Sequence, residues 1–432
     1  MKSLAEHGIR LAQYACHLAY RSLRLTARVI WCAGIARSAP ALRVAGEELA
    51  LLCEDLGPTF VKMGQILSSR PDLIHPELAS ALARLQDQSR PFSEAEVSTI
   101  LARAYGGKAK FIFSNFDYKP IAAASIAQVH TATLRSGKSV AVKIRRPGIV
   151  LQVDRDMALI RAFARAAGAL PFMRVVPLVD LVEELAVPIR EQLDFATEAE
   201  NNRRLRRDFA SIERIRIPAL IDELCTEDIL VMEFMDGLQK VSDNALTPYQ
   251  KQATALAGLR ALYRMIFING FVHADMHPGN VFPRNQGELV ILDTGLIARL
   301  SDTDRRDFTD FFFALANNDG NECARIVHDN ASYFSPRYSR PSFENEMRCL
   351  IARHSALKSS EFEVSTFVYQ LIGLQRTAGV RGSTKFIMTI LSMVVFDGIC
   401  KQLYPDCEFQ KESKPFLIAA RYGGGRRLAM TI

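Results

Sequence analysis

Hydrophobic residues follow two different spacings along the chain, and together these predict a protein of mixed helices and strands. Over residues 49–88 apolar side chains recur at three- and four-residue intervals, as on one face of a helix, for example Leu78, Leu82 and Leu85. Gly57-Pro58 and Arg70-Pro71 interrupt this pattern, because proline suits a helix start and the residue before it avoids helical backbone angles.

The pattern changes to strict alternation near position 120. Residues 127–134 and 139–145 alternate like strands, and Gly137 lies in the short turn between them, which predicts a β-hairpin. A buried strand is expected over residues 229–234, and a second hairpin over 281–282 and 289–292 through Asn285-Gln286-Gly287. Helices are expected over residues 154–169, 178–209 and 254–267, and everywhere after residue 302.

Composition indicates a folded protein with one basic end. Of the 432 residues 49% are hydrophobic and 23% charged, and the net charge is +7. Seven basic residues and one acidic residue lie in residues 1–45, so the rest of the chain is nearly neutral. Three interpretations of this helical segment stay open. It is a solvated basic helix face, a targeting peptide, or a surface helix held by anionic lipid at roughly 1 kcal/mol per basic residue. Its arginines include Arg10, Arg21, Arg24 and Arg28.

Cysteine usage and apolar run lengths bear on the compartment. The eight cysteines are scattered without a C-x-x-C pair, which favours reduced thiols in a cytosol-like environment. The longest apolar run near the C-terminus covers residues 386–396 and stops at Asp397, short of the roughly 20 residues that a membrane-spanning helix needs. We therefore expect no transmembrane helix, and no secretory signal is recognised.

The strongest chemical signal is His273-Ala274-Asp275-Met276-His277-Pro278-Gly279-Asn280, followed by Asp293-Thr294-Gly295. The spacing H-x-D-x-x-x-x-N and then D-x-G is typical of the catalytic and metal-binding loops of protein kinases. Phosphoryl transfer needs metal ions held by hard oxygen ligands, which Asn280 and Asp293 can supply. Asp275 is placed to accept a proton from an attacking hydroxyl or to orient a water.

The alternative for this segment is a zinc cluster or an ordinary surface loop. Two histidines four residues apart, His273 and His277, can bind zinc when they share a helix face. Pro278-Gly279 follows at once and argues against a continuing helix. We therefore expect His273 to support the loop backbone.

Other kinase-like features occur in the expected order. Val140-Ala141-Val142-Lys143 ends on a strand lysine that needs a carboxylate partner, for which Glu198 is the candidate. The strand over residues 229–234 resembles the kinase hinge, with Glu233 and Met235 as candidate adenine-binding positions, although Met232 and Phe234 suit a plain core equally well.

Two segments depart from an ordinary kinase. Ala122-Ala123-Ala124-Ser125 stands where a glycine-rich loop would approach phosphates, and alanine restricts the positive φ angles that such a loop uses. Lys62-Met63-Gly64-Gln65 places polar residues in an otherwise apolar helix, which by itself reads as an amphipathic helix.

Together with two further segments, these two resemble the UbiB family of kinase-like proteins, which are associated with ubiquinone biosynthesis. The further segments are Lys143-Ile144-Arg145-Arg146-Pro147-Gly148 and the loop of residues 273–280. The resemblance covers residues 46–300 and appears again near residues 400–406. The resemblance implies an α+β, protein-kinase-like two-lobed fold with an added N-terminal K-x-G-Q extension. The expected parts are residues 1–45 (basic segment), 46–120 (extension), 121–232 (N-lobe) and 233–432 (helical C-lobe).

The resemblance also implies residue roles. Lys143 would pair with Glu198 and hold ATP phosphates, while Ala122, Ala123, Ala124 and Ser125 would cover the nucleotide and Mg²⁺ would lie on Asn280 and Asp293. Lys62 and Gln65 would gate the pocket, with Asp194 as the carboxylate for Lys62. Two positions depart from the family pattern: Ala127 stands where some members have glycine, and Gln192-Leu193-Asp194 replaces E-x-D, with Glu191 one position early.

The working hypothesis is an atypical kinase or ATPase that supports quinone-lipid biosynthesis at a membrane surface, with protein phosphorylation disfavoured. ATP, anionic lipid and quinone-biosynthesis proteins or lipid intermediates are the expected partners, and nucleic acid is not. We expect a cytoplasmic protein on the inner face of a membrane, with an organelle as the other option. The rivals are a small-molecule phosphotransferase of the aminoglycoside or choline kinase type and a pseudokinase scaffold.

Overall fold

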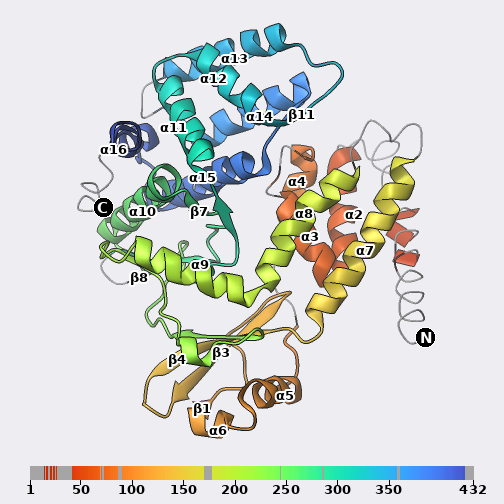
Figure 1. The fold of residues 1–432 in the computed structure, drawn as a ribbon, viewed down its shortest axis with the longest axis vertical. Helices are drawn as coiled ribbons and strands as arrows, with labels where there is room; N and C mark the ends of the chain where they lie inside the picture. The colour runs from red at the N-terminus through yellow and green to blue at the C-terminus, as the bar shows by residue number, and fades with distance from the viewer. Residues whose placement is uncertain are drawn as a thin grey trace. The chain divides into compact units, whose positions relative to one another are not determined.

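The computed structural model describes residues 41–68, 70, 73–85, 90–169, 178–243, 245–284, 287–357 and 361–423, with part of residues 14–26. The chain divides into two compact units (Figure 1). Unit 1 comprises residues 1–196 and 221–234, and unit 2 comprises residues 197–220 and 235–432. Each unit is described by itself, and the four-part division expected from the sequence stays a prediction.

Unit 1 contains an antiparallel sheet in the order β1-β3-β4-β6, with β2 paired to β3. The strands are β1 (Phe113–Phe116), β2 (Ala122–Ala123), β3 (Ala127–Leu134), β4 (Ser139–Arg145) and β6 (Ile229–Glu233). The predicted hairpin of residues 127–134 and 139–145 is confirmed, and Gly137 in its turn has a φ of 86° that suits glycine. The strand predicted over residues 229–234 is confirmed as β6.

One face of this sheet packs against a short helical layer, α5 (Glu94–Tyr105) and α6 (Ala109–Ile112). Ser93 and Glu96 form a capping box that starts α5, and Gly106 ends it in the left-handed conformation. Val97 and Leu101 pack with Val140 and Val142 in one buried cluster. A single-turn 3₁₀ helix, η2 (Asp222–Leu224), precedes β6.

The remaining helices of unit 1 are α2 (Ala41–Leu56), α3 (Pro58–Ser68), α4 (Pro76–Leu82), α7 (Ile149–Gly168) and α8 (Leu178–Leu193). Helix α3 is fastened to α7 because the Thr59 hydroxyl donates to the buried Asp156 carboxylate at 2.5 Å. The Arg70 guanidinium that follows α3 bonds Glu184 of α8 at 3.1 Å. These polar links hold the segment containing Lys62 and Gln65 against the α7–α8 pair.

One predicted helical block is interrupted. The helical block expected over residues 178–209 is confirmed, but it consists of two helices, because α8 ends at Leu193 and α9 (Phe195–Asp208) begins after Asp194. The Asp194 carboxylate accepts the Ala196 amide at 3.0 Å, so an aspartate that competes for backbone amides starts a new helix instead of continuing the old one. The helix expected from residue 154 begins earlier, at Ile149.

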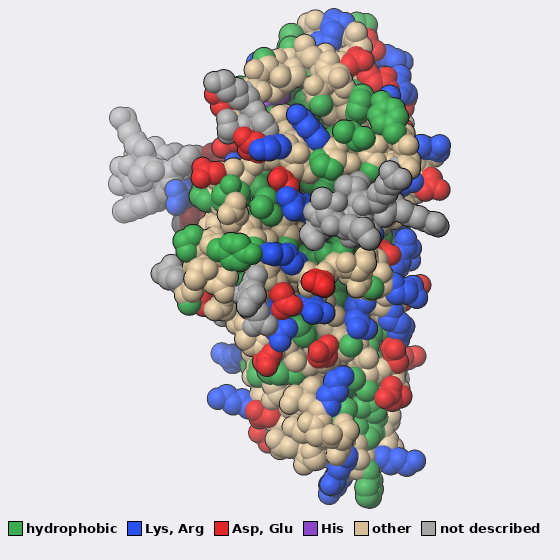
Figure 2. Space-filling model, turned by 90° about the vertical axis from the view of Figure 1, so that its left-hand side faces the viewer, with side chains coloured by type: hydrophobic (Ala, Val, Ile, Leu, Met, Phe, Trp, Pro, Cys, Tyr) green, Lys and Arg blue, Asp and Glu red, His purple; other side chains and the backbone are tan. Residues whose placement is uncertain are grey.

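Most of the basic N-terminal segment, with Arg10 and Arg28, lies outside the described residues. Arg21 and Arg24 are described, and both serve contacts within unit 1. Arg21 is buried and bonds Asp55 at 2.6 Å and Glu48 at 3.3 Å, and Arg24 lies 3.5 Å from Glu48. On the face drawn in Figure 2, Lys and Arg side chains are interspersed with Asp and Glu, as expected of a nearly neutral body.

Unit 2 has small sheets embedded in helices. A three-stranded sheet runs β5-β9-β8, from β5 (Ile215–Arg216), β9 (Glu288–Ile291) and β8 (Val281–Arg284), and a two-stranded ladder joins β7 (Phe271–His273) to β10 (Ile297–Arg299). The second predicted hairpin is therefore confirmed as β8–β9, although Asn285 and Gln286 of its turn lie outside the described residues. Both ladders flank the loops that carry Asp275 and Asp293.

Helices build the rest of unit 2 around one large apolar core. They are α10 (Pro248–Tyr263), its π-helical continuation η3 (Arg264–Asn269), α11 (Asp302–Ala316), α12 (Gly320–Asp329), α13 (Arg340–Ser355), α14 (Val364–Ala378), α15 (Thr384–Leu403) and α16 (Phe409–Tyr422). The expectation of helices alone after residue 302 is wrong at β11 (Ala331–Phe334) and β12 (Val380–Gly382). These two short strands pair with each other although they are far apart in the sequence, so the local spacing of apolar residues does not predict them.

Helix α15 contains the apolar run at residues 386–396, and the expectation of no transmembrane helix stays a prediction. Among the described residues it is the one helix long and apolar enough to cross a membrane, with 20 residues and a mean hydropathy of 1.6. Since 67% of the apolar window is buried inside the structure, α15 also fits the position of a core helix.

Close packing of α15 on α10 gives a stability prediction at Gly258. A Cβ added there would lie 2.2 Å from Phe396 Cζ and 2.8 Å from Leu289 Cδ2. Gly258→Ala should therefore lower the free energy of unfolding by about 1–3 kcal/mol, despite the better helix propensity of alanine. The measurement is urea denaturation. The matched control is Gly373→Ala in α14, where a Cβ meets nothing within 4 Å, and which should be neutral or stabilising. Equal effects of the two variants would contradict the packing argument.

Candidate nucleotide and metal site

In unit 2, one buried imidazole connects the two predicted phosphotransfer loops. His273 ends β7 and is fully buried. Its Nδ1 accepts the Asp275 amide at 3.2 Å, so its Nε2 carries the proton and donates to the Asp293 carbonyl oxygen. The prediction that His273 supports the backbone is confirmed, and the bond holds the Asp275 and Asp293 loops together.

Asp275 and Asn280 face each other across the first loop. The Asn280 side-chain nitrogen donates to the Asp275 carbonyl at 3.0 Å and to its carboxylate at 3.1 Å. With the nitrogen used in this way, Asn280 Oδ1 is the side-chain atom that can coordinate a cation. His277 Nε2 lies 3.6 Å from the same Asp275 carboxylate oxygen.

The second loop carries Asp293 and is fastened to α9. The Gly295 amide donates to Asp293 Oδ1 at 2.8 Å, which orients the carboxylate. The Thr294 hydroxyl donates to the Glu198 carbonyl at 3.1 Å, and Asn201 donates to the Thr294 carbonyl at 3.0 Å. Unit 2 therefore brings Glu198, Asp293, Asp275 and Asn280 into one hydrogen-bonded region.

The zinc alternative for this loop finds no support in the described part of the chain. His273 lies on a strand, so the two histidines do not share a helix face. Among the described residues no group of three or more His, Cys, Asp and Glu side chains is placed to hold a metal. A magnesium–nucleotide site needs fewer protein ligands, because phosphate oxygens and water complete the shell.

Lys143 belongs to unit 1, at the centre of its sheet. It pairs with Val129 of β3 and Leu230 of β6, and only 8% of it is exposed. Its Nζ lies 5.4 Å from the centre of the Phe195 ring. A lysine buried to this degree requires negative charge nearby. Glu198 is also buried but falls in unit 2, so their pairing stays a prediction.

The alanine-rich loop lies in the same sheet and is held by Arg146. Ala122 and Ala123 form β2, and the Ala124 amide donates to the Ala127 carbonyl at 2.7 Å to close a tight turn. The Arg146 guanidinium donates to the carbonyls of Ser125 at 3.0 Å and Ala124 at 3.1 Å. Its backbone amide bonds the Ile126 carbonyl at 2.8 Å. These bonds hold the loop against Arg146, and how the loop meets phosphates stays a prediction.

A buried chain of hydrogen bonds lies behind this loop. The Phe92 amide donates to Gln128 Oε1 at 3.0 Å, and Gln128 Nε2 lies 2.9 Å from His130 Nε2. His130 Nδ1 lies 2.9 Å from the Asp117 carbonyl. Because a carbonyl only accepts, Nδ1 carries the proton and Nε2 accepts from Gln128. The chain is complete only while His130 is neutral.

This network predicts acid sensitivity of unit 1. Burial lowers the pKa of His130, partly opposed by its hydrogen bond to Asp117. In the unfolded chain the histidine has its ordinary pKa of about 6.5, so below that pH it binds a proton that the native, buried His130 does not take up. The free energy of unfolding is therefore highest above about pH 6.5 and decreases as the pH falls below it. The free energy of unfolding, measured by urea denaturation between about pH 5 and 7.5, should fall more steeply in the wild type than in His130→Gln. Parallel pH profiles for the two proteins would contradict it.

The K-x-G-Q helix has a structural role within unit 1. A Cβ at Gly64 would lie 2.3 Å from Leu85 Cδ1, so glycine permits close packing of α3 beside the end of α4. Gln65 Nε2 donates to the Leu85 carbonyl at 3.2 Å. Lys62 is half-buried on the same helix. Asp194 caps α9, as described above, and the gating role of these residues stays a prediction.

The candidate hinge follows β6. Glu233 is its last residue and pairs with Val140, and the Phe234 amide donates to the Ser139 carbonyl at 3.3 Å. Met232 and Met235 are buried, which is what core residues would also show. Adenine binding at Glu233 and Met235 therefore stays a prediction.

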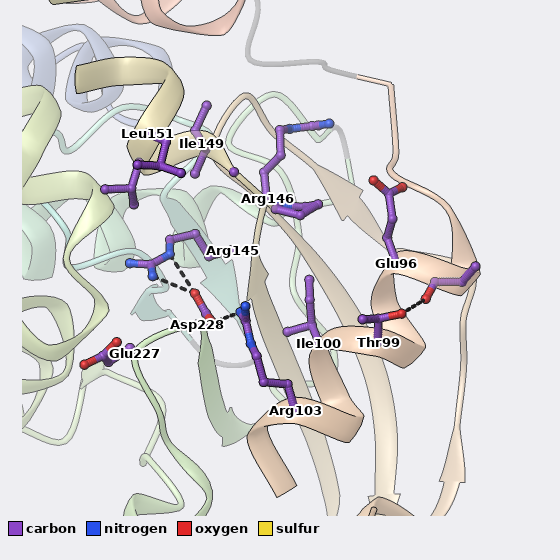
Figure 3. A pocket seen from close by; sticks show the side chains of 14 residues that line it. Glu96, Thr99, Ile100, Arg103, Arg145, Arg146, Ile149, Leu151, Glu227 and Asp228 are labelled. Atoms are coloured by element: carbon purple, nitrogen blue, oxygen red, sulfur yellow. Dashed lines mark hydrogen bonds and ion pairs between the residues drawn. The ribbon is translucent and has the colours of Figure 1, made fainter. Parts of the chain in front are cut away.

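Unit 1 also contains a pocket of about 680 Å³ between α5, the Arg146-Pro147-Gly148 turn and the start of α7 (Figure 3). On its wall Asp228 bonds Arg145 at 2.6 Å and also contacts Arg103. The described residues that line this pocket do not include Lys143 or the alanine-rich loop. The arginines of the K-I-R-R-P-G segment thus serve structural contacts, Arg145 with Asp228 and Arg146 with the loop.

Three residues that hold the candidate site in place were given no role of their own in the sequence analysis: Arg146, Asn201 and Thr294. The consecutive polar residues Asn201 and Asn202, which are buried on the arginine-rich helix α9, are a signal that could have drawn attention to this face. Arg146 could not be recognised, because its partners depend on how the loop returns to the sheet.

Comparison with known proteins identifies the family. The ABC1 atypical kinase-like domain matches residues 84–327, more than half of the chain. Proteins named "Probable protein kinase UbiB" are similar along most of their length. The one from Vibrio cholerae serotype O1 (strain M66-2) is 31% identical over 427 residues, covering 96% of this chain and 77% of that protein. The one from Vibrio vulnificus (strain CMCP6) is 33% identical over 382 residues, covering 86% and 70%.

A solved structure supports the fold. The structure described as "The complex structure of Rv3197-erythromycin from Mycobacterium tuberculosis" superposes with a TM-score of 0.56, covering 93% of this chain and 96% of that one. At 20% identity this likeness concerns the fold alone. It agrees with the predicted kinase-like α+β architecture, and the predicted resemblance is confirmed. The chain belongs to the ABC1 family of atypical kinase-like proteins, with the UbiB proteins as its relatives.

Proposed function

We propose that this protein binds Mg-ATP and uses it, by hydrolysis or by transfer to a small acceptor, in support of ubiquinone biosynthesis at a membrane surface. The observation that carries the proposal is the bonding of the Asp275–Asn280 loop and the Asp293 loop through His273. A preorganised pair of oxygen ligands beside a carboxylate base suits phosphoryl transfer, in which positioning and electrostatics supply most of the catalysis.

The residues fit a magnesium ion. Asn280 offers Oδ1 because its nitrogen is bonded to Asp275, and Asp293 offers a carboxylate oriented by the Gly295 amide. These are hard oxygen donors of the kind that magnesium prefers. When bound, the ion neutralises charge on the phosphates. Asp275 orients the attacking hydroxyl or water and accepts its proton.

The remaining roles extend the proposal to unit 1. Lys143 holds the α- and β-phosphates with Glu198 as its partner, and Ala122–Ser125 cover the nucleotide. Glu233 and Met235 contact adenine, while Lys62, Gln65 and Asp194 control access of the acceptor. The rigid loop held by Arg146 supports this arrangement, because a fixed loop costs little ordering entropy on nucleotide binding.

The membrane part of the proposal rests on the basic segment before residue 46. Arg21 and Arg24 are engaged with Glu48 and Asp55, so other basic residues would contact anionic lipid. Such contacts would place the protein on the inner face of a membrane, with quinone-biosynthesis proteins or lipid intermediates as partners.

One assay separates this function from its rivals. ATP hydrolysis by the full chain is measured with Mg²⁺, with and without liposomes containing anionic lipid, and with a soluble amino-alcohol as a parallel acceptor. The proposal predicts magnesium-dependent hydrolysis that anionic liposomes increase. Phosphate transfer to the amino-alcohol at roughly 1–10³ s⁻¹ would instead favour a small-molecule kinase. Nucleotide binding without turnover in every condition would favour a pseudokinase scaffold.

A further inference from the structure

The end of the unit 1 sheet beside α6 carries the most exposed large hydrophobic side chain among the described residues. This is Phe111, which is 77% exposed. Helix α6 lies beside the turn of the β3–β4 hairpin, because the Arg135 amide donates to the Ile112 carbonyl at 3.0 Å. We call these two adjoining segments, residues 106–112 and 135–138, the apex of unit 1 (Figure 1).

The apex is basic and contains no acidic residue. Elsewhere in unit 1 positive charge is balanced locally, as where Arg103 and Arg145 both contact Asp228. At the apex no carboxylate among the described residues forms an ion pair with the basic side chains. At the lower end of the face drawn in Figure 2, Lys and Arg side chains lie next to exposed hydrophobic ones. Four exposed positive charges thus lie together at the apex, those of Lys108, Lys110, Arg135 and Lys138.

Hydrogen bonds hold Phe111 in its exposed position. Its amide donates to the Lys108 carbonyl at 2.8 Å within α6, and the Arg135 guanidinium donates to the Lys110 carbonyl at 2.9 Å. The neighbouring Ile112 side chain packs against the apolar cluster between α5 and the sheet. Phe111 is therefore presented outward on a fixed backbone, which loses little conformational entropy on binding.

We propose that the apex docks unit 1 onto an anionic lipid surface. Phe111 enters the boundary between the headgroups and the acyl chains, and the four basic side chains around it contact lipid phosphates. The inference rests on the membrane part of the proposed function and deepens it, because it names a contact surface that is separate from the basic segment before residue 46.

The composition of the apex favours lipid over an acidic protein surface as its partner. Three of its four basic residues are lysines, and lysine is depleted from protein–protein interfaces, whereas anionic membranes attract lysine and arginine alike. A protein interface is also built on several buried apolar side chains around a centre. The apex offers one large exposed hydrophobic side chain, Phe111, inside a ring of positive charge.

The test is cosedimentation of the full chain with vesicles of phosphatidylcholine alone or of an equal mixture of phosphatidylcholine and phosphatidylglycerol. The wild type should bind the mixed vesicles, and salt should weaken this binding. Phe111→Ser should lower the partition coefficient roughly 10-fold, because it removes the inserted ring. The double variant Lys108→Gln with Lys110→Gln should lower it by roughly 10-fold as well, because it removes two positive charges.

Matched controls separate the apex from exposed residues in general. Phe163→Ser changes a phenylalanine of α7 that is 67% exposed, and Lys385→Gln changes an exposed lysine of α15. Both should bind mixed vesicles as the wild type does. Since Phe111, Lys108 and Lys110 are exposed, their variants should fold, and without vesicles they should hydrolyse ATP at the wild-type rate.

Three results would overturn the inference. Wild-type binding by the apex variants would assign the membrane contact to the basic segment before residue 46. Equal losses in Phe163→Ser and Phe111→Ser would show that the apex has no special part. Failure of the wild type to bind mixed vesicles would leave an acidic protein surface as the partner of the apex. Absence of ATP hydrolysis in every protein would count against the proposed function, while the vesicle comparison would still stand.

Discussion

Asp293→Asn should weaken magnesium-dependent nucleotide binding by roughly 100-fold or more, which corresponds to about 2.7 kcal/mol. The substitution keeps the shape of the side chain and an oxygen, but removes the negative charge that a divalent cation requires. Gly295 can still donate to the remaining oxygen, as it does to Asp293 Oδ1 at 2.8 Å. The loop should therefore keep its fold. Isothermal titration with ATP, with and without Mg²⁺, measures the effect.

The matched control is Asp302→Asn at the start of α11. It removes the same charge from an aspartate whose side chain is 89% exposed and lies 3.4 Å from the Arg305 guanidinium, one turn along the same helix. Its nucleotide affinity should equal that of the wild type. If Asp293→Asn binds Mg-ATP as tightly as this control, the metal assignment of Asn280 and Asp293 is wrong.

Asp275→Asn should lower turnover by about 10²–10⁴-fold while nucleotide affinity changes little. The variant loses the group that accepts a proton or orients water, but an amide oxygen can still accept the bond that Asn280 now donates at 3.1 Å. The contrast between lost turnover and retained binding is what a positioned base predicts. Single-turnover ATP hydrolysis beside a binding titration measures both quantities.

Two results would contradict this role. Turnover near the wild-type rate would mean that Asp275 is not the base, and parallel losses of binding and turnover would indicate a structural role in holding Asn280. His277→Gln is a useful comparison because His277 lies 3.6 Å from the same carboxylate yet has no assigned part in the chemistry. It should change turnover far less than Asp275→Asn.

Local features of the fold were predictable because neighbouring residues encode them. The β3–β4 hairpin follows from two alternating segments around Gly137, and its bounds agree with the structure. The candidate phosphotransfer loops were predicted from the spacing of Asp275, Asn280 and Asp293, and the structure connects the two loops through His273. The helix break at Asp194 was not predicted, because apolar residues recur at helical spacing on both sides of it. The hydrogen bond from the Ala196 amide to the Asp194 carboxylate, which starts the second helix, cannot be recognised from that spacing.

The sequence by itself predicted the family and the two hairpins, which are confirmed, and it supplied the candidate metal-binding and catalytic side chains, whose roles stay predictions. Tertiary structure decided how those groups are held: Thr294 bonds Glu198 across 96 positions, and Arg146 closes over the carbonyls of Ala124 and Ser125. It also brought β11 to β12. The physical reason is that periodicity and motif spacing report only neighbours along the chain. Hydrogen bonds between distant residues exist only after apolar burial has fixed the path of the backbone.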